Sequence, residues 1–284
     1  MTPSIGVALE TARRKLRDRT DSPALDAQIL LSAAIGRPRA WLLAHPEFEL
    51  SDEQEIRLTE SLDQVLAGIA LPHVLGEWEF YGRAFRLSQS VLIPRPESEL
   101  IVELAVRLAP RIGAEPRILD VGTGSGCIAV TLALELPGAS VLACDVSAEA
   151  LQIARLNAET HGVAARVACV QADLLAGLTG PFDLMCANLP YVTTEELRTL
   201  AVREPRLALD GGLDGLGLIS RLVTDLPRVL AMRSAALLEI DPRQAERVVG
   251  MARRNLPGST VELAQDLARR DRVVVIRAGG LRAD

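Results

Sequence analysis

The sequence predicts an α/β protein with a doubly wound parallel sheet, which a β-hairpin linker joins to a small N-terminal all-helical domain. From Arg117 onward, short apolar runs alternate with helical stretches, whereas residues 1–75 carry helix signals only. Alternating strands and helices are typical of a parallel sheet that helices cover on both faces. The 284 residues suffice for one medium domain and one small domain.

The helical region has clear starts and stops. Ser22 is a cap that precedes Pro23 at the first helical position, and Gly36 follows the end of the same helix. Ser51 and Gln54 have the spacing of a capping box before the next helix. No catalytic constellation accompanies these signals. We therefore expect the region to dock a macromolecular substrate rather than to carry chemistry.

The pattern changes at Gly76. The run EFYGRAFRLSQSVLI reads as two short strands around a Gly-Arg turn, which makes residues 76–93 a hairpin between two domains. A helix is predicted from about Glu97 to Leu108, near the start of a second domain over residues 94–284.

The strands of this second domain are short and apolar. The candidates are RILDV, SVLAC, RVACV, FDLMCAN, AALLEI and RVVVIR. Two helical stretches, IAVTLALEL and AEALQIARLNAET, lie between the early strands. Ligands of such sheets bind at the carboxyl ends of the strands, so the informative residues should directly follow them.

Composition narrows the class of partner. The formal net charge is -6, and no basic run is visible, which disfavours a nucleic-acid duplex as the main partner. None of the four cysteines lies in a C-x-x-C pair, so we expect no metal site. The first residues lack the pattern of a signal peptide, and no apolar run approaches the roughly 20 residues of a membrane span. We expect a cytoplasmic protein without a membrane partner.

A glycine-rich loop follows the strand RILDV. Glycines let the backbone turn sharply and let a ligand approach it closely. Related loops serve NAD enzymes, and some merely make turns, so the loop alone is a weak signal. Asp145 ends the next strand, 23 residues after Gly122. An acidic side chain at about this spacing accepts hydrogen bonds from ribose hydroxyls. The loop and the acid together indicate a ribose-bearing cofactor. The residues of the loop are Gly122, Thr123, Gly124, Ser125 and Gly126.

A second polar group follows the strand FDLMCAN, at Asn188-Leu189-Pro190-Tyr191. The Asn188 side-chain oxygen and the Leu189 carbonyl can accept the two N–H groups of a planar amide or amine. Because Leu189 precedes a proline, its backbone is biased toward extended conformations, which aims that carbonyl. Tyr191 can pack on the flat group. This arrangement suits methyl transfer to nitrogen from a methyl-sulfonium donor by orientation alone.

These motifs together resemble the HemK/PrmC family of protein-glutamine N5-methyltransferases. The resemblance runs nearly end to end, and its most specific parts are VLIPRPESE, the Asn-x-Pro-Tyr motif and EPRLALDGGLDGL. It implies a class I, Rossmann-like S-adenosylmethionine-dependent methyltransferase. The implied reaction methylates the side-chain amide of the glutamine in the Gly-Gly-Gln motif of peptide chain release factors.

The resemblance also implies roles for individual residues. The glycine loop would line the methionine part of S-adenosylmethionine, and Asp145 would hold its ribose. Asp173 and Leu174 would flank the adenine. Asn188 would contact both the cofactor and the glutamine amide. The glutamine amide would also be bound by Leu189, Pro190 and Tyr191. The catalytic residues would be Asn188, Pro190 and Tyr191. Glu97 would edge the site or cap the following helix.

Two departures from the family pattern keep other substrates open. Leu189 stands where the family usually has proline, and LAGIALPHV stands where it usually has a charged stretch with Gly-Glu-Pro. Asn-Leu-Pro-Tyr is also similar to the motif of ribosomal-RNA adenine dimethyltransferases. The alternatives are an adenine-N6 methyltransferase acting on RNA or DNA, a glutamine methylase of a ribosomal protein, and a non-enzymatic scaffold.

Overall fold

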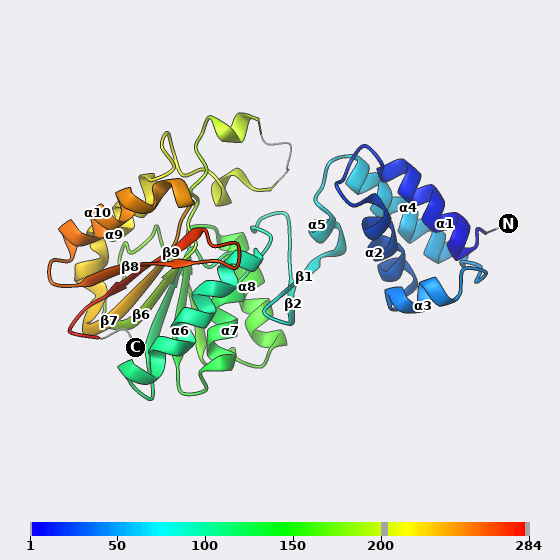
Figure 1. The fold of residues 1–284 in the computed structure, drawn as a ribbon. Coiled ribbons are helices and arrows are strands. Elements are labelled where there is room, and N and C mark those ends of the chain that lie inside the picture. The colour runs from blue at the N-terminus through cyan, green and yellow to red at the C-terminus, as the bar shows by residue number, and fades with distance from the viewer. Residues whose placement is uncertain (1, 200–203, 282–284) are drawn as a thin grey trace. The chain divides into compact units, whose positions relative to one another are not determined.

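The chain folds into two compact units in a computed structural model, which describes residues 2–199 and 204–281. The division falls between Glu77 and Trp78. The first unit is helical, and the second contains the main sheet (Figure 1). Each unit has a hydrophobic core of its own. Within the described residues, no helix is long and apolar enough to cross a membrane.

The first unit buries the apolar faces of its helices against one another. Ile5, Leu16, Leu30, Leu31 and Leu42 are at most 1% exposed. The helices are α1 (Ile5–Leu16), α2 (Pro23–Ile35), α3 (Arg39–Ala44), α4 (Asp52–Leu66) and α5 (Leu71–Leu75).

The predicted ends of α2 and the predicted start of α4 are confirmed, although the Ser22 side chain makes no capping hydrogen bond in the structure. Pro23 stands in the first turn of α2, and Gly36 ends the helix with a left-handed φ of 73°. At the start of α4, Ser51 Oγ accepts from the Gln54 backbone N–H at 3.3 Å. Gln54 Oε1 accepts from the Ser51 N–H at 3.0 Å, which completes the capping box.

The hairpin consists of β1 (Glu77–Phe80) and β2 (Arg83–Arg86), which pair in a two-stranded sheet. Its turn lies at Tyr81 and Gly82, both with positive φ, one position earlier than the expected Gly-Arg turn. Phe80 and Phe85 are buried and pack edge to face, with ring centroids 6.1 Å apart. The following residues, 87–93, form no strand.

The main sheet has the order β5-β4-β3-β6-β7-β9-β8. Strands β3 to β7 run parallel, and β9 pairs antiparallel with both β7 and β8. The edge strand β8 is missing from the sequence prediction, because its residues are mostly exposed and form no apolar run. The strands are β3 (Arg117–Val121), β4 (Ser140–Asp145), β5 (Val167–Gln171), β6 (Phe182–Ala187), β7 (Leu230–Glu239), β8 (Thr260–Gln265) and β9 (Asp271–Arg277).

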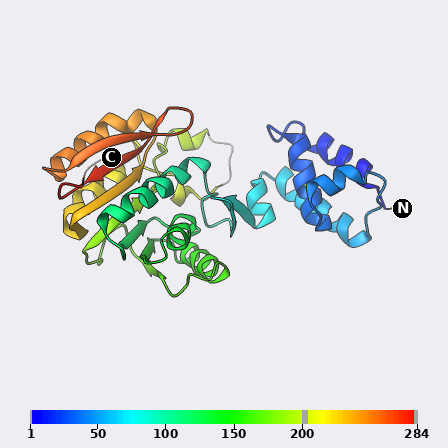
Figure 2. The ribbon, with the colours of Figure 1, turned by 60° about the horizontal axis from the view of Figure 1, so that its bottom comes forward.

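Helices cover both faces of the sheet, as predicted for a doubly wound fold (Figures 1 and 2). Alternate strand residues supply the two cores. Ile118 packs in the core that includes α6 and α7, whereas Leu119 packs in the core that includes α9 and α10. The helices are α6 (Glu99–Ile112), α7 (Cys127–Glu135), α8 (Ala148–Thr160), α9 (Gly217–Val229) and α10 (Ala245–Asn255).

One buried side chain on α8 ties the hairpin to the glycine loop. Asn157 is fully buried, and its Oδ1 accepts from the Arg86 backbone N–H at 2.8 Å. Its Nδ2 donates to the Arg86 carbonyl at 3.0 Å and to the Ser125 carbonyl at 2.8 Å. A single amide therefore fixes β2 and the loop after β3 relative to each other.

We expect Asn157→Ala to lower the free energy of unfolding by at least about 2 kcal/mol, because each buried polar group left without a partner costs about 1–3 kcal/mol. Urea denaturation measures the change. Asn255→Ala is the matched control, since its Nδ2 donates only to the Met251 carbonyl within α10. Equal losses for the two variants would contradict a special role for Asn157.

Candidate active site

A cavity of about 270 Å³ lies at the carboxyl ends of the parallel strands. The loops that follow β3, β4 and β6 all contribute to its wall. In the sheet, β4 and β5 lie on one side of β3, and β6 and β7 lie on the other. The cavity therefore stands at the topological switch point, where doubly wound sheets bind ligands.

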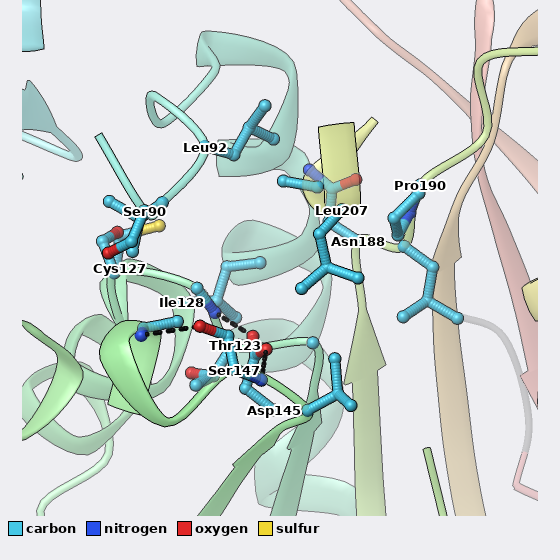
Figure 3. Close-up of a pocket in the computed structure, with 18 of the residues that line it drawn as sticks. Ser90, Leu92, Thr123, Cys127, Ile128, Asp145, Ser147, Asn188, Pro190 and Leu207 are labelled. Atoms are coloured by element: carbon cyan, nitrogen blue, oxygen red, sulfur yellow. Dashed lines mark hydrogen bonds between the residues drawn. The ribbon is translucent and has the colours of Figure 1, made fainter. Parts of the chain in front are cut away.

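Most of the predicted site residues meet in this cavity (Figure 3). Gly126 and Tyr191 do not line it. Gly126 precedes α7, and a Cβ added to it would lie 2.9 Å from Ala154 Cβ, so this glycine permits close packing of α7 on α8. The predicted residues that line the cavity are Gly122, Thr123, Gly124, Ser125, Asp145, Asp173, Leu174, Asn188, Leu189 and Pro190.

The glycine loop needs its glycines for conformation. Gly122 and Gly124 have φ values of 72° and 54°, in the left-handed region that favours glycine. A Cβ on Gly122 would lie 2.9 Å from Leu189 Cδ2, so the loop packs tightly on the segment after β6. At Gly124, by contrast, the Cβ position has no heavy atom within 4 Å. The backbone at Gly124 is thus open to a ligand.

Asp145 has a structural task besides the predicted one. Its Oδ2 accepts from the Gly124 backbone N–H at 2.9 Å, and its Oδ1 accepts from the Ser147 N–H at 2.9 Å. Figure 3 shows both bonds at the end of β4. A carboxylate oxygen accepts up to two hydrogen bonds, so each oxygen keeps capacity for a ligand hydroxyl.

Asp173 and Leu174 follow β5 and reach the cavity from its side of the sheet. The Asp173 carboxylate is paired with Arg221 of α9 at 2.7 Å, an ion pair that nothing in the local sequence indicated. Leu174 has a φ of 53°, which is unusual for a residue with a side chain, and that side chain is 9% exposed. The strained turn places both residues at one wall.

Asn188 stands just after β6, and its Nδ2 donates to Ser98 Oγ at 2.8 Å. Leu189 next to it is only 4% exposed. Its side chain fills space against Gly122, a packing role beyond the backbone role that the sequence suggested.

The structure also shows a buried acid near Asn188, Glu239, whose role was not predicted from the sequence. Ser98 Oγ donates to Glu239 Oε2 at 2.6 Å, and Tyr191 Oη donates to Glu239 Oε1 at 3.2 Å. Ser98 and Glu239 are 2% and 1% exposed. Tyr191 thus faces Glu239 rather than the cavity. A signal was available, since Glu239 is a charged residue inside the apolar run AALLEI, and acids are rarely buried without partners.

The segment VLIPRPESE forms another wall. Val91, Leu92, Pro94, Arg95 and Ser98 line the cavity, whereas Glu97 does not. The segment is held by Glu204 of the motif EPRLALDGGLDGL. The buried Glu204 carboxylate accepts from the Ile93 N–H at 3.0 Å and from the Arg95 guanidinium.

The remainder of the same motif supports the Asn-Leu-Pro-Tyr loop from behind. A Cβ on Gly211 would lie 2.7 Å from the Pro190 carbonyl oxygen. A Cβ on Gly215 would lie 2.2 Å from the Tyr191 carbonyl oxygen. Gln244 Nε2 donates to the Tyr191 carbonyl at 3.0 Å. The glycines let two backbone segments touch, which fixes the path of the loop.

Two buried carboxyl groups have strongly shifted pKa values. Burial raises the pKa of Asp120 to about 7, although the Thr123 hydroxyl, which donates to it at 2.6 Å, opposes the shift. Burial also raises the pKa of Glu239 to about 7, opposed by Ser98, Arg272 and Tyr191. Both groups therefore change protonation state near neutral pH.

The cavity thus combines two kinds of chemistry. One end presents a glycine-lined backbone and the Asp145 carboxylate, which suit a polar cofactor with hydroxyl groups. The wall also contains Asn188, whose amide Ser98 orients, together with Leu189 and Pro190, and an oriented amide suits a planar N–H donor. In the described residues, no group of three or more His, Cys, Asp or Glu side chains could hold a metal ion.

Comparison with known families identifies the class of the protein. Residues 98–205 match the family described as Methyltransferase small domain, and residues 7–76 match the one described as PrmC N-terminal domain. With the Rossmann-like sheet and the cavity at its switch point, these matches define a methyltransferase.

Close relatives then identify the family. The chain is 40% identical to the release factor glutamine methyltransferase of Bradyrhizobium diazoefficiens over 257 residues, 87% of this chain and 86% of the relative. It is 38% identical to the enzyme of that name from Deinococcus radiodurans over 274 residues, 95% of this chain and 97% of the relative. The chain belongs to the release factor glutamine methyltransferase family.

Similar solved structures support the fold. The ribosomal protein L11 methylase from Lactobacillus delbrueckii subsp. bulgaricus has a TM-score of 0.51 and 23% identity, covering 68% of this chain and 85% of its own. The hMettl16 catalytic domain in complex with a MAT2A 3′UTR hairpin has a TM-score of 0.57 and 18% identity, covering 78% of this chain and 82% of its own. The predicted fold class is confirmed, but the fold alone does not select a substrate.

The raised pKa values of Asp120 and Glu239 predict how stability depends on pH. Because each group binds a proton more tightly in the folded state, its contribution is fully present at acidic pH and is lost as pH rises through about 7. We expect the free energy of unfolding to fall by about 1 kcal/mol per group between roughly pH 6 and pH 8.

Urea denaturation at both pH values tests this, with the double variant Asp120→Asn, Glu239→Gln as the control. The variant should lose most of the difference. A wild-type protein whose stability rises with pH, or a variant with the same slope, would show that other groups dominate.

Proposed function

We propose that this protein transfers the methyl group of S-adenosylmethionine to the side-chain amide nitrogen of a glutamine in a peptide chain release factor. One observation carries the proposal: a single cavity joins the glycine loop and Asp145 to the Asn188-Leu189-Pro190 segment. Family membership supports both the reaction and the class of substrate.

The cofactor end of the cavity fits S-adenosylmethionine. The open backbone at Gly124 suits the close approach of a ligand, and Asp145 keeps acceptor capacity for ribose hydroxyls. Asp173 and Leu174 form the wall for the adenine. When bound, S-adenosylmethionine supplies a methyl group activated by a positively charged sulfur.

The substrate end fits a primary amide. Asn188 Nδ2 is engaged by Ser98, so Oδ1 is the atom that accepts a substrate N–H. The Leu189 carbonyl accepts the second N–H, which turns the nitrogen lone pair toward the cofactor. The nitrogen lone pair would form the new bond to the methyl carbon while the carbon–sulfur bond breaks and its electron pair stays on sulfur. The nitrogen would carry positive charge at that point and would then lose one proton to water. The two acceptor oxygens stabilise that charge.

Leu207 adds an apolar edge to the cavity. Its side chain lines the cavity and is 61% exposed. Leu92 lines the cavity from the VLIPRPESE segment. Such apolar groups at a cavity help to exclude water from a bound side chain. A short uncharged side chain such as glutamine matches this surrounding better than a charged one.

Asn188→Ala and Asp145→Ala should have opposite kinetic signatures. Loss of the Asn188 oxygen should lower kcat by at least about 100-fold, with cofactor Kd changed less, because the oxygen acts on the developing charge. Loss of Asp145 should weaken cofactor binding at least about tenfold, since hydrogen bonds to a charged acceptor contribute about 1.5–3 kcal/mol each.

Calorimetry with S-adenosylhomocysteine and transfer of labelled methyl to a release factor measure the two effects. Purified ribosomal protein, RNA and DNA serve as parallel substrates for the wild type. Methylation of RNA or DNA in preference to release factor would reject the proposed substrate, and so would preference for ribosomal protein.

The helical unit, with predicted bounds 1–75, is proposed to dock the release factor. One glutamine is too small to supply the roughly 1,200–2,000 Å² that specific protein complexes bury. The unit presents an aromatic cluster, in which Trp41 stacks on His45 at 4.4 Å and meets Phe48 edge-on at 5.2 Å. Phe48 and nearby Leu43 are 41% and 58% exposed. Aromatic residues such as Trp and Phe are enriched in the cores of protein interfaces.

We expect the double variant Leu43→Ala, Phe48→Ala to raise KM for intact release factor about tenfold, with kcat unchanged. Activity on a short glutamine peptide should stay at the wild-type level. Ile56→Ala on α4, where the side chain is 57% exposed, is the matched surface control. Unchanged KM for intact factor would place the docking surface elsewhere.

A further inference from the structure

A buried chain of hydrogen bonds joins Glu239, Ser98 and Asn188, and each bond in it has a defined donor and acceptor. Glu239 lies at the end of β7, Ser98 lies just before α6, and Asn188 follows β6. Ser98 Oγ stands between the other two, 2.6 Å from Glu239 Oε2 and 2.8 Å from Asn188 Nδ2. The Tyr191 hydroxyl holds the second carboxylate oxygen at 3.2 Å.

The number of protons fixes which way each bond points. An ionised carboxylate only accepts, so the single hydroxyl proton of Ser98 is directed to Glu239. The Ser98 oxygen is then left as an acceptor, and only the Nδ2 end of the Asn188 amide can donate to it. The Oδ1 end then points away from Ser98 and is left to accept a hydrogen bond from a substrate N–H.

Protonation of Glu239 would remove this constraint. A protonated Oε2 can donate to Ser98, whose own proton is then free to point at Asn188. The Asn188 amide could then turn over and present Nδ2 to a substrate N–H. Two donors would face each other, and the substrate amide would lose its acceptor.

The charged groups around Glu239 act on its pKa in opposite directions. Arg272 of β9 opposes the rise of the Glu239 pKa, and Glu97 next to Ser98 adds to it. Arg272 is itself paired with Asp266 at 3.3 Å. Tyr191 completes the surroundings as a hydrogen-bond donor.

We propose that Glu239 is a positioning residue that acts through Ser98 to hold the Asn188 amide with its oxygen toward the substrate. The inference rests on the proposed function of Asn188, because it explains how that side chain presents an acceptor. Glu239 touches neither substrate nor cofactor in this scheme. Its effect should therefore reach kcat and its pH dependence rather than ligand affinity.

Ser98→Ala is the first test, because it removes one oxygen and breaks the relay, the chain of hydrogen bonds from Glu239 through Ser98 to Asn188. We expect kcat to fall at least about tenfold, as for loss of one oriented donor or acceptor, with cofactor Kd unchanged. Ser98→Thr keeps the hydroxyl and should recover most of the rate. Ser234→Ala is the matched control, since Ser234 is fully buried on β7 and donates only to the Ala231 carbonyl at 2.7 Å.

The pH profile separates positioning from mere packing. Wild-type kcat should fall on the acid side of the Glu239 titration, whereas Ser98→Ala should show a low rate without that acid limb. Glu239→Leu, which removes both acceptor oxygens, should be slow at every pH. If Glu239→Leu fails to fold, Ser98→Ala decides alone. Wild-type rates and an unchanged acid limb in Ser98→Ala would overturn the proposal.

A spectroscopic measurement tests the inference without turnover. The side-chain NH₂ signals of Asn188 in ¹⁵N-labelled protein, assigned by their loss in Asn188→Ala, should shift as Glu239 titrates. In Ser98→Ala the shift should vanish. A shift that persists there would overturn the relay. Because no substrate is needed, this result stands apart from whether the wild type methylates a release factor, so failure of the proposed function and failure of the relay are distinguishable.

Discussion

The parallel pairing of β3 with both β4 and β6 is the constraint on which the rest of the site depends. Val121 at the end of β3 is in register with Cys144 on one side and Ala187 on the other. The residues that follow these three positions, Gly122, Asp145 and Asn188, therefore lie at one level at the carboxyl ends of the strands. The glycine loop, Asp145 and Asn188 meet in space for this reason, although they are far apart in the chain.

Much of the site could be predicted because its residues follow strands, and strands are visible as apolar runs. Gly122, Asp145 and Asn188 are found this way. Partners that tertiary packing brings together leave no such pattern. Glu239 is 141 residues from Ser98, and Arg221 is 48 residues from Asp173. The edge strand β8 was missed for a related reason, because a mostly exposed strand has no continuous apolar run.

The segments around the cavity form a second layer that holds the reacting groups. Asn157 fixes the glycine loop to β2, Glu204 fixes the VLIPRPESE segment, and Gln244 fixes the Tyr191 carbonyl. Each bond joins a side chain to a backbone atom of another element. Precision at the site therefore depends on side chains that never reach the cavity. The buried Leu189 side chain, which itself lines the cavity, adds to this support because it packs on Gly122.

Stability and activity favour different protonation states of the buried Glu239 carboxyl group. Its protonated form suits the apolar surroundings, whereas the ionised form orders the amide at the cavity. A search for heat-resistant variants that selects on folding alone should accumulate neutral residues at this position. The favoured substitution would give a more stable protein in which the Asn188 amide is no longer held in one orientation. Directed evolution of this protein thus needs a screen for turnover alongside the screen for stability.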